Sequence, residues 1–182
     1  YYYQSWWSKS TVLHLYPHWN WTGQEGKIKR VFCNTNCEEA ELFVNGASAG
    51  RKAVPAHSRL RWEVPYQPGS IEVQGYRDGE LVASTRRETT NKPFAIQLSP
   101  DRDSIRADKQ DVALVTLKIL DNEGRMVPTA NHTVKITVSE NARILGVCNG
   151  DPGCHVLENQ TAYPVFNGLL MVFVQSGPSA GP

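Results

Sequence analysis

The chain has 182 residues, a hydrophobic fraction of 40% and a formal net charge of +1 at pH 7. This length allows one large domain or two small ones, and the apolar fraction is sufficient for hydrophobic cores. The balanced charge excludes the strong electrostatic footprint of a protein that binds nucleic acid or an anionic membrane. The apolar run at 169–174 is far shorter than the ~20 residues of a transmembrane helix. We therefore expect no nucleic acid and no membrane among its partners.

The first eight residues, YYYQSWWS, are more apolar than a chain end normally is. Five large rings occupy the first seven positions: Tyr1, Tyr2, Tyr3, Trp6 and Trp7. Burying one such ring removes roughly 150–250 Å² from water, whereas a free terminus is usually polar and frayed. Two interpretations stay open: the segment packs against a part of a larger protein, or it folds back onto this chain's own core. We favour the first.

Beyond this segment the sequence predicts β-strands, because β-forming runs recur about every ten residues between turn signals. The run LRWEVPY at 60–66 alternates apolar and charged residues, which indicates one buried and one solvated face. The pairs Asn45-Gly46 and Asp78-Gly79 are signals for two-residue hairpins. The predicted strands of this half are 12–17, 27–36, 40–44, 60–66, 70–77 and 80–88.

The polar stretch 88–93 ends in proline and predicts a short linker. A second β-series follows it, with predicted strands at 94–101, 111–121, 133–140, 143–150 and 169–176. We predict an all-β chain of two tandem immunoglobulin-like β-sandwiches, 11–89 and 90–182, after a short N-terminal segment, 1–10. The second sandwich is expected to lack its last strand, since only GPSAGP comes after the strand at 169–176.

Several segments resemble one known family in collinear order over essentially the whole chain. They are YYYQSWW, VLHLYPHWNW, FCNTNCEEAELFVNGASAGRK, LSPDRDSIRADKQDVALVTLKILDNEGRMVPTA, RILGVCNGDPGCH and AYPVFNGLLMVFVQS. The region they resemble follows the catalytic barrel in the β-galactosidases of glycoside hydrolase family 2. HWNW, ELFVNG and GxxNGDP are the most specific of these motifs.

The resemblance implies a modular bacterial enzyme that hydrolyses terminal β-galactosides in carbohydrate metabolism, without a cofactor, in the periplasm or outside the cell. Residues 1–10 would be the end of the last helix of its (β/α)8 barrel. Tyr1, Tyr2, Tyr3, Trp6 and Trp7 would then face that barrel, the expected partner in the same polypeptide. The family's two catalytic glutamates precede this region, so the chain would carry no catalytic residue, would be inactive alone, and could take part in a homo-oligomer.

The residues themselves give the same expectation of inactivity. Retaining glycosidases need two carboxyl groups about 5–5.5 Å apart. The acidic groups of this chain lie in predicted turns or on outer strand faces, at 38–41, 101–103 and 108–111. The chain also has no G-x-S-x-G or H-E-x-x-H motif, and no metal site is predicted.

A second class of function stays open, that of a carbohydrate-binding module. The HWNW motif places His18, Trp19 and Trp21 directly after a strand, and tryptophan faces stack on sugar rings. These three residues are the candidate galactoside-binding residues, with Trp62 as a further platform. The alternative, which we favour, is that the indoles pack in an interface or in the core. A third class, an adhesion stalk, fits the aromatic N-terminus poorly.

The four cysteines form two local pairs, Cys33/Cys37 and Cys148/Cys154. Their C-x3-C and C-x5-C spacings are poor matches to zinc sites. Cys148 and Cys154 flank the turn-rich NGDPG and could form a disulfide or stay free, while Cys33 and Cys37 are expected to be free thiols.

Overall fold

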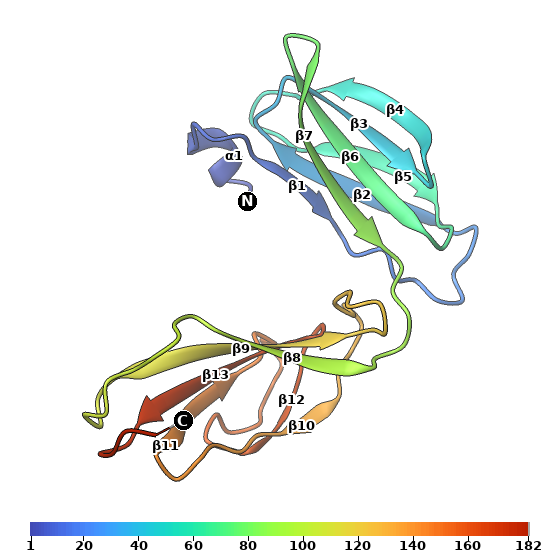
Figure 1. Ribbon diagram of the computed structural model, residues 1–182. Helices are drawn as coiled ribbons and strands as arrows, with labels where there is room; N and C mark the ends of the chain where they lie inside the picture. Colours follow the sequence, from blue (N-terminus) through green and yellow to red (C-terminus); the bar gives the residue numbers. More distant parts are fainter. Residues whose placement is uncertain (182) are drawn as a thin grey trace. The chain divides into compact units, whose positions relative to one another are not determined.

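A computed structural model describes residues 1–181 and divides the chain into two compact units, Tyr1–Thr89 and the part from Thr90 onward (Figure 1). The all-β expectation is confirmed, since the one helix of the described residues is the single turn α1 (Gln4–Trp7). No helix in this part of the chain has the length and apolarity to cross a membrane. The last residue of the predicted second sandwich, 182, lies outside the described residues.

The N-terminal unit is a sandwich of two antiparallel sheets. The first sheet has the strand order β1-β2-β5, with β1 (Leu13–Tyr16), β2 (Ile28–Thr35) and β5 (Leu60–Pro65). The second sheet has the order β4-β3-β6-β7, with β3 (Glu39–Val44), β4 (Ala47–Ala53), β6 (Ser70–Arg77) and β7 (Glu80–Glu88). This division of seven strands between two layers is that of an immunoglobulin-like sandwich.

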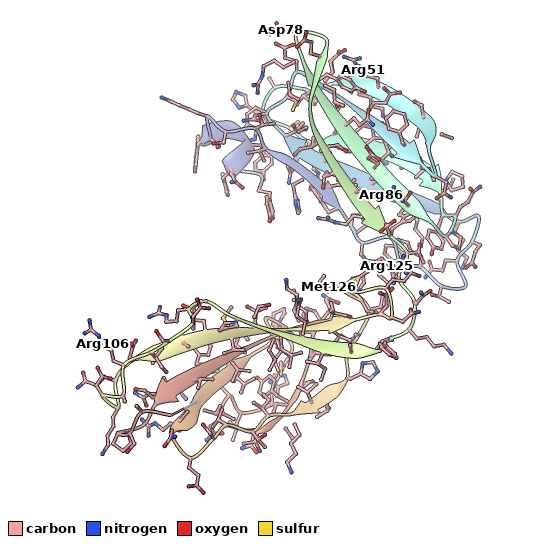
Figure 2. All side chains as sticks on the ribbon, in the orientation of Figure 1. Arg51, Asp78, Arg86, Arg106, Arg125 and Met126 are labelled. Carbon is pink, nitrogen blue, oxygen red and sulfur yellow. The ribbon has the colours of Figure 1, made fainter. Side chains whose placement is uncertain are left out.

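The core of this unit lies between the two sheets, and its strands contribute alternate apolar residues to it. Leu60, Trp62 and Val64 of β5 are buried while the residues between them are exposed, as the pattern predicts. Asn45 and Asp78 have positive φ angles in the two-residue turns of the β3–β4 and β6–β7 hairpins, which confirms both hairpin signals. Figure 2 shows Asp78 at the tip of its hairpin.

The C-terminal unit has a four-stranded sheet and a two-stranded sheet, both antiparallel. The larger sheet has the order β11-β13-β9-β8, with β8 (Ala95–Pro100), β9 (Val112–Leu120), β11 (Ala142–Cys148) and β13 (Leu169–Ser176). The smaller sheet pairs β10 (Thr133–Lys135) with β12 (Ala162–Pro164). Arg106, labelled in Figure 2, lies in the loop between β8 and β9.

Asp121, directly after β9, organises the turn that follows this strand. Its buried carboxylate accepts the backbone N–H groups of Asn91, Glu123 and Arg125, each at 2.9 Å. The guanidinium of Arg125, labelled in Figure 2, donates two further bonds of 2.9 and 2.8 Å. Burial opposes the charge, but these hydrogen bonds outweigh it and hold the pKa of Asp121 well below its usual range.

Candidate functional site: an aromatic face on the N-terminal unit

Strand β1 sends apolar residues inward and aromatic residues outward. Leu15 is fully buried, and Leu13 packs against the same core. Because strand side chains alternate between faces, His14 and Tyr16 lie on the outer face of the first sheet. Phe32 of β2 is opposite Tyr16 in the strand register. The sheet thus presents three rings side by side away from its core.

These rings and Tyr1 form a continuous row of stacked contacts. The ring centroids are 3.6 Å apart for Tyr1 and His14, 5.4 Å for His14 and Tyr16, and 5.5 Å for Tyr16 and Phe32. Arg59 closes the row, with its guanidinium carbon 4.6 Å from the Phe32 centroid and a 3.4 Å bond to the Tyr16 hydroxyl. Such stacked arrangements fix the orientation of each ring.

Helix α1 lies near β1 (Figure 1), and it and the residues just before it carry a second group of rings. The Tyr2 hydroxyl donates to the His57 carbonyl at 2.9 Å, and the Trp6 ring lies 5.0 Å from the His57 ring. Tyr3 and Trp7 stack on each other at 5.2 Å. We call Tyr1, Tyr2, Tyr3, Trp6, Trp7, His14, Tyr16 and Phe32 the aromatic face.

The outer part of the aromatic face is open to solvent. Tyr1 is 68% exposed, Tyr3 66% and Trp7 79%. The Trp6 indole N–H is buried without a hydrogen-bond partner in the described part of the chain. A hollow of about 290 Å³ lies in the face, lined by Tyr2, Tyr16, His57, Ser58 and Arg59. The N-terminal segment therefore folds back onto this unit only in part, because Tyr2 and Trp6 contact it while Tyr3 and Trp7 remain uncovered.

The electrostatics of the aromatic face favour a neutral histidine. Burial, followed by the charges of Arg87 and the N-terminal ammonium group, lowers the pKa of His14. A neutral imidazole can stack closely on Tyr1 without the cost of desolvating a cation. The face presents mainly aromatic carbon, with the guanidinium of Arg59 at one end.

Trp19, one of the candidate sugar-binding residues, lies in the core of the N-terminal unit. It is 0% exposed, its indole N–H donates to the Gln67 carbonyl at 2.9 Å, and its ring packs edge-on to Tyr66 at 5.1 Å. Its faces are therefore inaccessible to a sugar, and the expectation of a galactoside platform at Trp19 is wrong. Trp62 is likewise 2% exposed, with its indole N–H bound to the Gly50 carbonyl. The favoured alternative, core packing, applies to both.

The other two aromatic residues of the HWNW motif, His18 and Trp21, lie against each other. The His18 and Trp21 rings stack at 4.6 Å, and Lys29 Nζ lies 4.2 Å from the Trp21 centroid. Burial, then the charge of Lys29, lowers the pKa of His18. Trp21 borders an open depression of about 580 Å³ that is also lined by Arg30 and Glu63. The Trp21 ring thus already has partners on the protein itself.

The acidic groups take structural roles. Asp101 pairs with Arg102 at 3.0 Å and accepts the Leu114 N–H, and Asp108 accepts two backbone N–H groups of its own turn. Hydrogen bonding lowers the pKa of both carboxyls. The carboxyl that acts as general acid in a glycosidase instead needs a raised pKa. Every displaced carboxyl pKa among the described residues moves downward: Glu63, Glu72, Asp101, Asp108 and Asp121.

All four cysteines are free thiols in the structure. The Cys148–Cys154 disulfide is therefore absent, and the free-thiol alternative describes this pair. The Cys154 thiol donates to the Tyr163 hydroxyl at 3.7 Å instead. Cys33 and Cys37 are buried, as expected for free thiols in a core. No cluster of three metal-ligating side chains occurs within residues 1–181.

Sequence reasoning found the five rings of residues 1–7 but missed the β1 and β2 members of the aromatic face. The signal was present, because VLHLYP alternates Leu13 and Leu15 with His14 and Tyr16. An outward row of rings on a strand indicates a covered surface as directly as an apolar terminus does. Phe32 could not be placed without the register that puts it opposite Tyr16.

Comparison with known families gives two matches. The family Glycoside hydrolase family 2 C-terminal domain 5 matches residues 96–182, and a Domain of unknown function (DUF4982) matches residues 26–83. The chain is 39% identical over its whole length to Beta-galactosidase BoGH2A of Bacteroides ovatus. A Beta-glucuronidase of Formosa agariphila is 29% identical over 73% of the chain. The chain spans only 21% and 14% of these two relatives.

Solved structures agree with the sequence relatives. A beta-glycosidase from Bacteroides vulgatus matches 98% of the chain with a TM-score of 0.92 and 35% identity, over 23% of its own length. A beta-glucuronidase from glycoside hydrolase family 2 matches with a TM-score of 0.83 and 26% identity, over 19% of its length. With its β-sandwich architecture and these matches to both of its units, the chain belongs to the C-terminal region of glycoside hydrolase family 2.

Proposed function

We propose that this chain is the non-catalytic C-terminal portion of a β-galactosidase, supporting its catalytic barrel and shaping the mouth of its active site. The observation that carries the proposal is the exposed aromatic face, in which Tyr1, Tyr3 and Trp7 are between 66% and 79% exposed. Buried interface cores are enriched in tyrosine, tryptophan and arginine, the residue types gathered here.

In this proposal, residues 1–10 are the end of the last barrel helix, and 11–89 and 90–182 are the two sandwiches that follow it. The single turn of α1 supports this, because so short a helix gains little stability from its own hydrogen bonds and depends on packing. Interfaces between domains of one chain commonly bury about 600–1,500 Å². The aromatic face supplies one side of such an interface, and the barrel supplies the other.

In this role, the chain itself does not catalyse glycoside hydrolysis. A retaining mechanism needs one carboxyl with a raised pKa near a second ionised one. The downward shifts at Asp101 and Asp108 oppose that role. In this proposal the two catalytic carboxyls belong to the preceding barrel. Terminal β-galactosides are the proposed substrates, since the β-galactosidase relative is similar to the whole chain.

Activity assays test the proposal in two steps. The 182-residue chain should hydrolyse neither p-nitrophenyl β-galactoside nor the β-glucuronide, whereas the full-length protein should hydrolyse the galactoside. In the full-length protein, the double variant Tyr3→Ala/Trp7→Ala should lower the melting temperature of the barrel and reduce its activity. The control Leu81→Ala removes another exposed apolar side chain, 55% exposed on β7, and should change neither. Equal behaviour of both variants would contradict the proposed interface.

A further inference from the structure

The two units share the arrangement of their first layer. β8, β9 and β13 pair in the order β8-β9-β13, as β1, β2 and β5 pair in the order β1-β2-β5. In each unit the next strand in sequence, β3 or β10, belongs to the second sheet and pairs there with a later strand, β4 or β12. β10 is therefore the counterpart of β3.

The second layers differ in their number of strands. β3 is paired on both edges, with β4 on one side and β6 on the other, and β6 continues into the β6–β7 hairpin. Within residues 1–181, β10 is paired only with β12, and residues 177–181, which follow β13, contain no strand. In the described residues, the second sheet of the C-terminal unit thus has two strands, whereas the second sheet of the N-terminal unit has four.

The consequence is an uncovered core face on β8. In the N-terminal unit, β6 and β7 lie against β1, and Leu15 of β1 is 1% exposed. On β8, Ile96 and Leu98 are opposite Ile119 and Leu117 of β9, which belong to the core. Residues directly opposite each other in a sheet share a face. Yet Ile96 is 55% exposed and Leu98 61%, a large apolar exposure on the inner side of a sandwich.

The free edge of β10 identifies what would cover this face. Val165 N donates to the His132 carbonyl at 2.8 Å, and Ile136 N donates to the Thr161 carbonyl at 2.7 Å. Residues 132 and 136 thus direct these backbone groups toward β12. Successive residues of a strand direct their N–H and C=O groups to opposite edges, so those of Thr133 and Lys135 point away from β12. Only an extended backbone offers partners at this spacing.

A hollow connects the free edge with the uncovered face. It measures about 330 Å³ and lies between β8 and β10, lined by Phe94, Ile96, Ile119 and Val134 among others. Phe94 is 77% exposed at its rim. The position corresponds to the place of β6 in the N-terminal unit, where Ile71 and Val73 fill the core with 0% exposure.

We propose that a β-hairpin of the same polypeptide, C-terminal to β13 in the full-length protein, fills this groove as β6 and β7 do in the N-terminal unit. Its first strand pairs antiparallel with the free edge of β10, and its alternate apolar residues cover Ile96 and Leu98. This completion of the sandwich is independent of the enzyme activity proposed above. It predicts a run with the apolar alternation of β6 in the sequence after residue 182.

Hydrogen exchange of β10 tests the proposal, measured by mass spectrometry with fragmentation to single residues. In the 182-residue chain, Val134 and Ile136 should be protected by β12 while the amides of Thr133 and Lys135 exchange freely. In the full-length protein all four amides should be protected, with exchange at Thr133 and Lys135 slowed roughly tenfold or more. Free exchange at Thr133 and Lys135 in the full-length protein would overturn the proposal.

A substitution pair gives a second readout. Leu98→Asp should leave the melting temperature of the 182-residue chain unchanged and lower that of the full-length protein. The control Leu157→Asp, at a side chain 69% exposed outside the groove, should change neither. If instead the full-length protein protects Thr133 and Lys135 only in a concentration-dependent dimer, a second copy fills the groove and the proposal of a hairpin in cis is wrong.

Discussion

The ring of Tyr1 lies on the imidazole of His14, with centroids 3.6 Å apart and planes 4° from parallel. This contact joins the start of the chain to the outer face of β1. The rings of the N-terminal segment and those of the sheet therefore form one continuous surface. It also shields His14, whose pKa is lowered by burial, then by Arg87 and the N-terminal ammonium group.

The lowered pKa of His14 predicts a pH dependence of stability. The unfolded chain takes up a proton at His14 near pH 6.5, while the folded chain does so only at lower pH. Folding is therefore disfavoured increasingly as the pH falls below about 6.5, down to the folded pKa. We expect urea unfolding of the N-terminal unit to show a smaller decrease in stability from pH 7 to pH 5 in His14→Gln. An identical decrease in both proteins would contradict the prediction.

Replacing Trp19 or Trp7 by alanine should change the stability of the 182-residue chain by very different amounts. Trp19→Ala removes a fully buried indole and its bond to Gln67, which should cost about 3–5 kcal/mol of unfolding free energy. Trp7→Ala removes a ring that is 79% exposed and should stay within about 0.5 kcal/mol of the parent. Urea unfolding followed by circular dichroism measures both. A small effect at Trp19 would contradict its place in the core.

Asp121 predicts acid sensitivity of the C-terminal unit. Its hydrogen bonds outweigh burial and depress its pKa, so its stabilising effect is present above the unfolded value near 3.9 and is lost as the pH falls through the folded value. Asp121→Asn removes the buried carboxylate that pairs with Arg125, although Arg125 keeps its ion pair with Glu123, and should cost about 1–3 kcal/mol at pH 7.

The same substitution should flatten the pH dependence of unfolding below about pH 4 in the C-terminal unit. Asp103→Asn, on an exposed turn residue, is the matched control and should leave both quantities unchanged. Parallel acid-unfolding curves for Asp121→Asn and the parent chain would show that this carboxylate is not the group responsible.

The thiols should differ in reactivity. Burial, reinforced by Cys37, raises the pKa of Cys33 to about 12, and both residues are buried, so neither should react with an alkylating reagent before unfolding. Cys148 is exposed and should react first, followed by the half-buried Cys154. Peptide mapping after timed alkylation gives the order. Recovery of Cys148 and Cys154 as a disulfide from the untreated protein would contradict the free-thiol state.

The fold class followed from local patterns, whereas part of the site depended on tertiary placement. Alternation at 60–66 and the turns at Asn45 and Asp78 predicted strands and hairpins that the structure has. β12 was missed because a three-residue strand carries too short a pattern to recognise. The predicted strand at 133–140 is shorter in the structure, where β10 ends at Lys135.

Burial of the tryptophans could not be predicted from the HWNW motif. Trp19 and Trp21 are two positions apart, yet Trp19 is fully buried in the core and Trp21 lines an open depression. That difference is set by Gln67 and Tyr66, which are distant in sequence and approach Trp19 only in the folded unit. Short motifs name residues that can stack on a sugar, but burial decides whether they are accessible.

Hydroxyl-radical footprinting of Trp7 tests the central claim most directly, because the aromatic face is proposed to be covered by the preceding barrel. Trp7 should be oxidised rapidly in the 182-residue chain, where it is 79% exposed, and should be protected in the full-length protein. Trp19 and Trp62 serve as buried references in both proteins, and Leu157 as an exposed one. Equal oxidation of Trp7 in the two proteins would contradict the account.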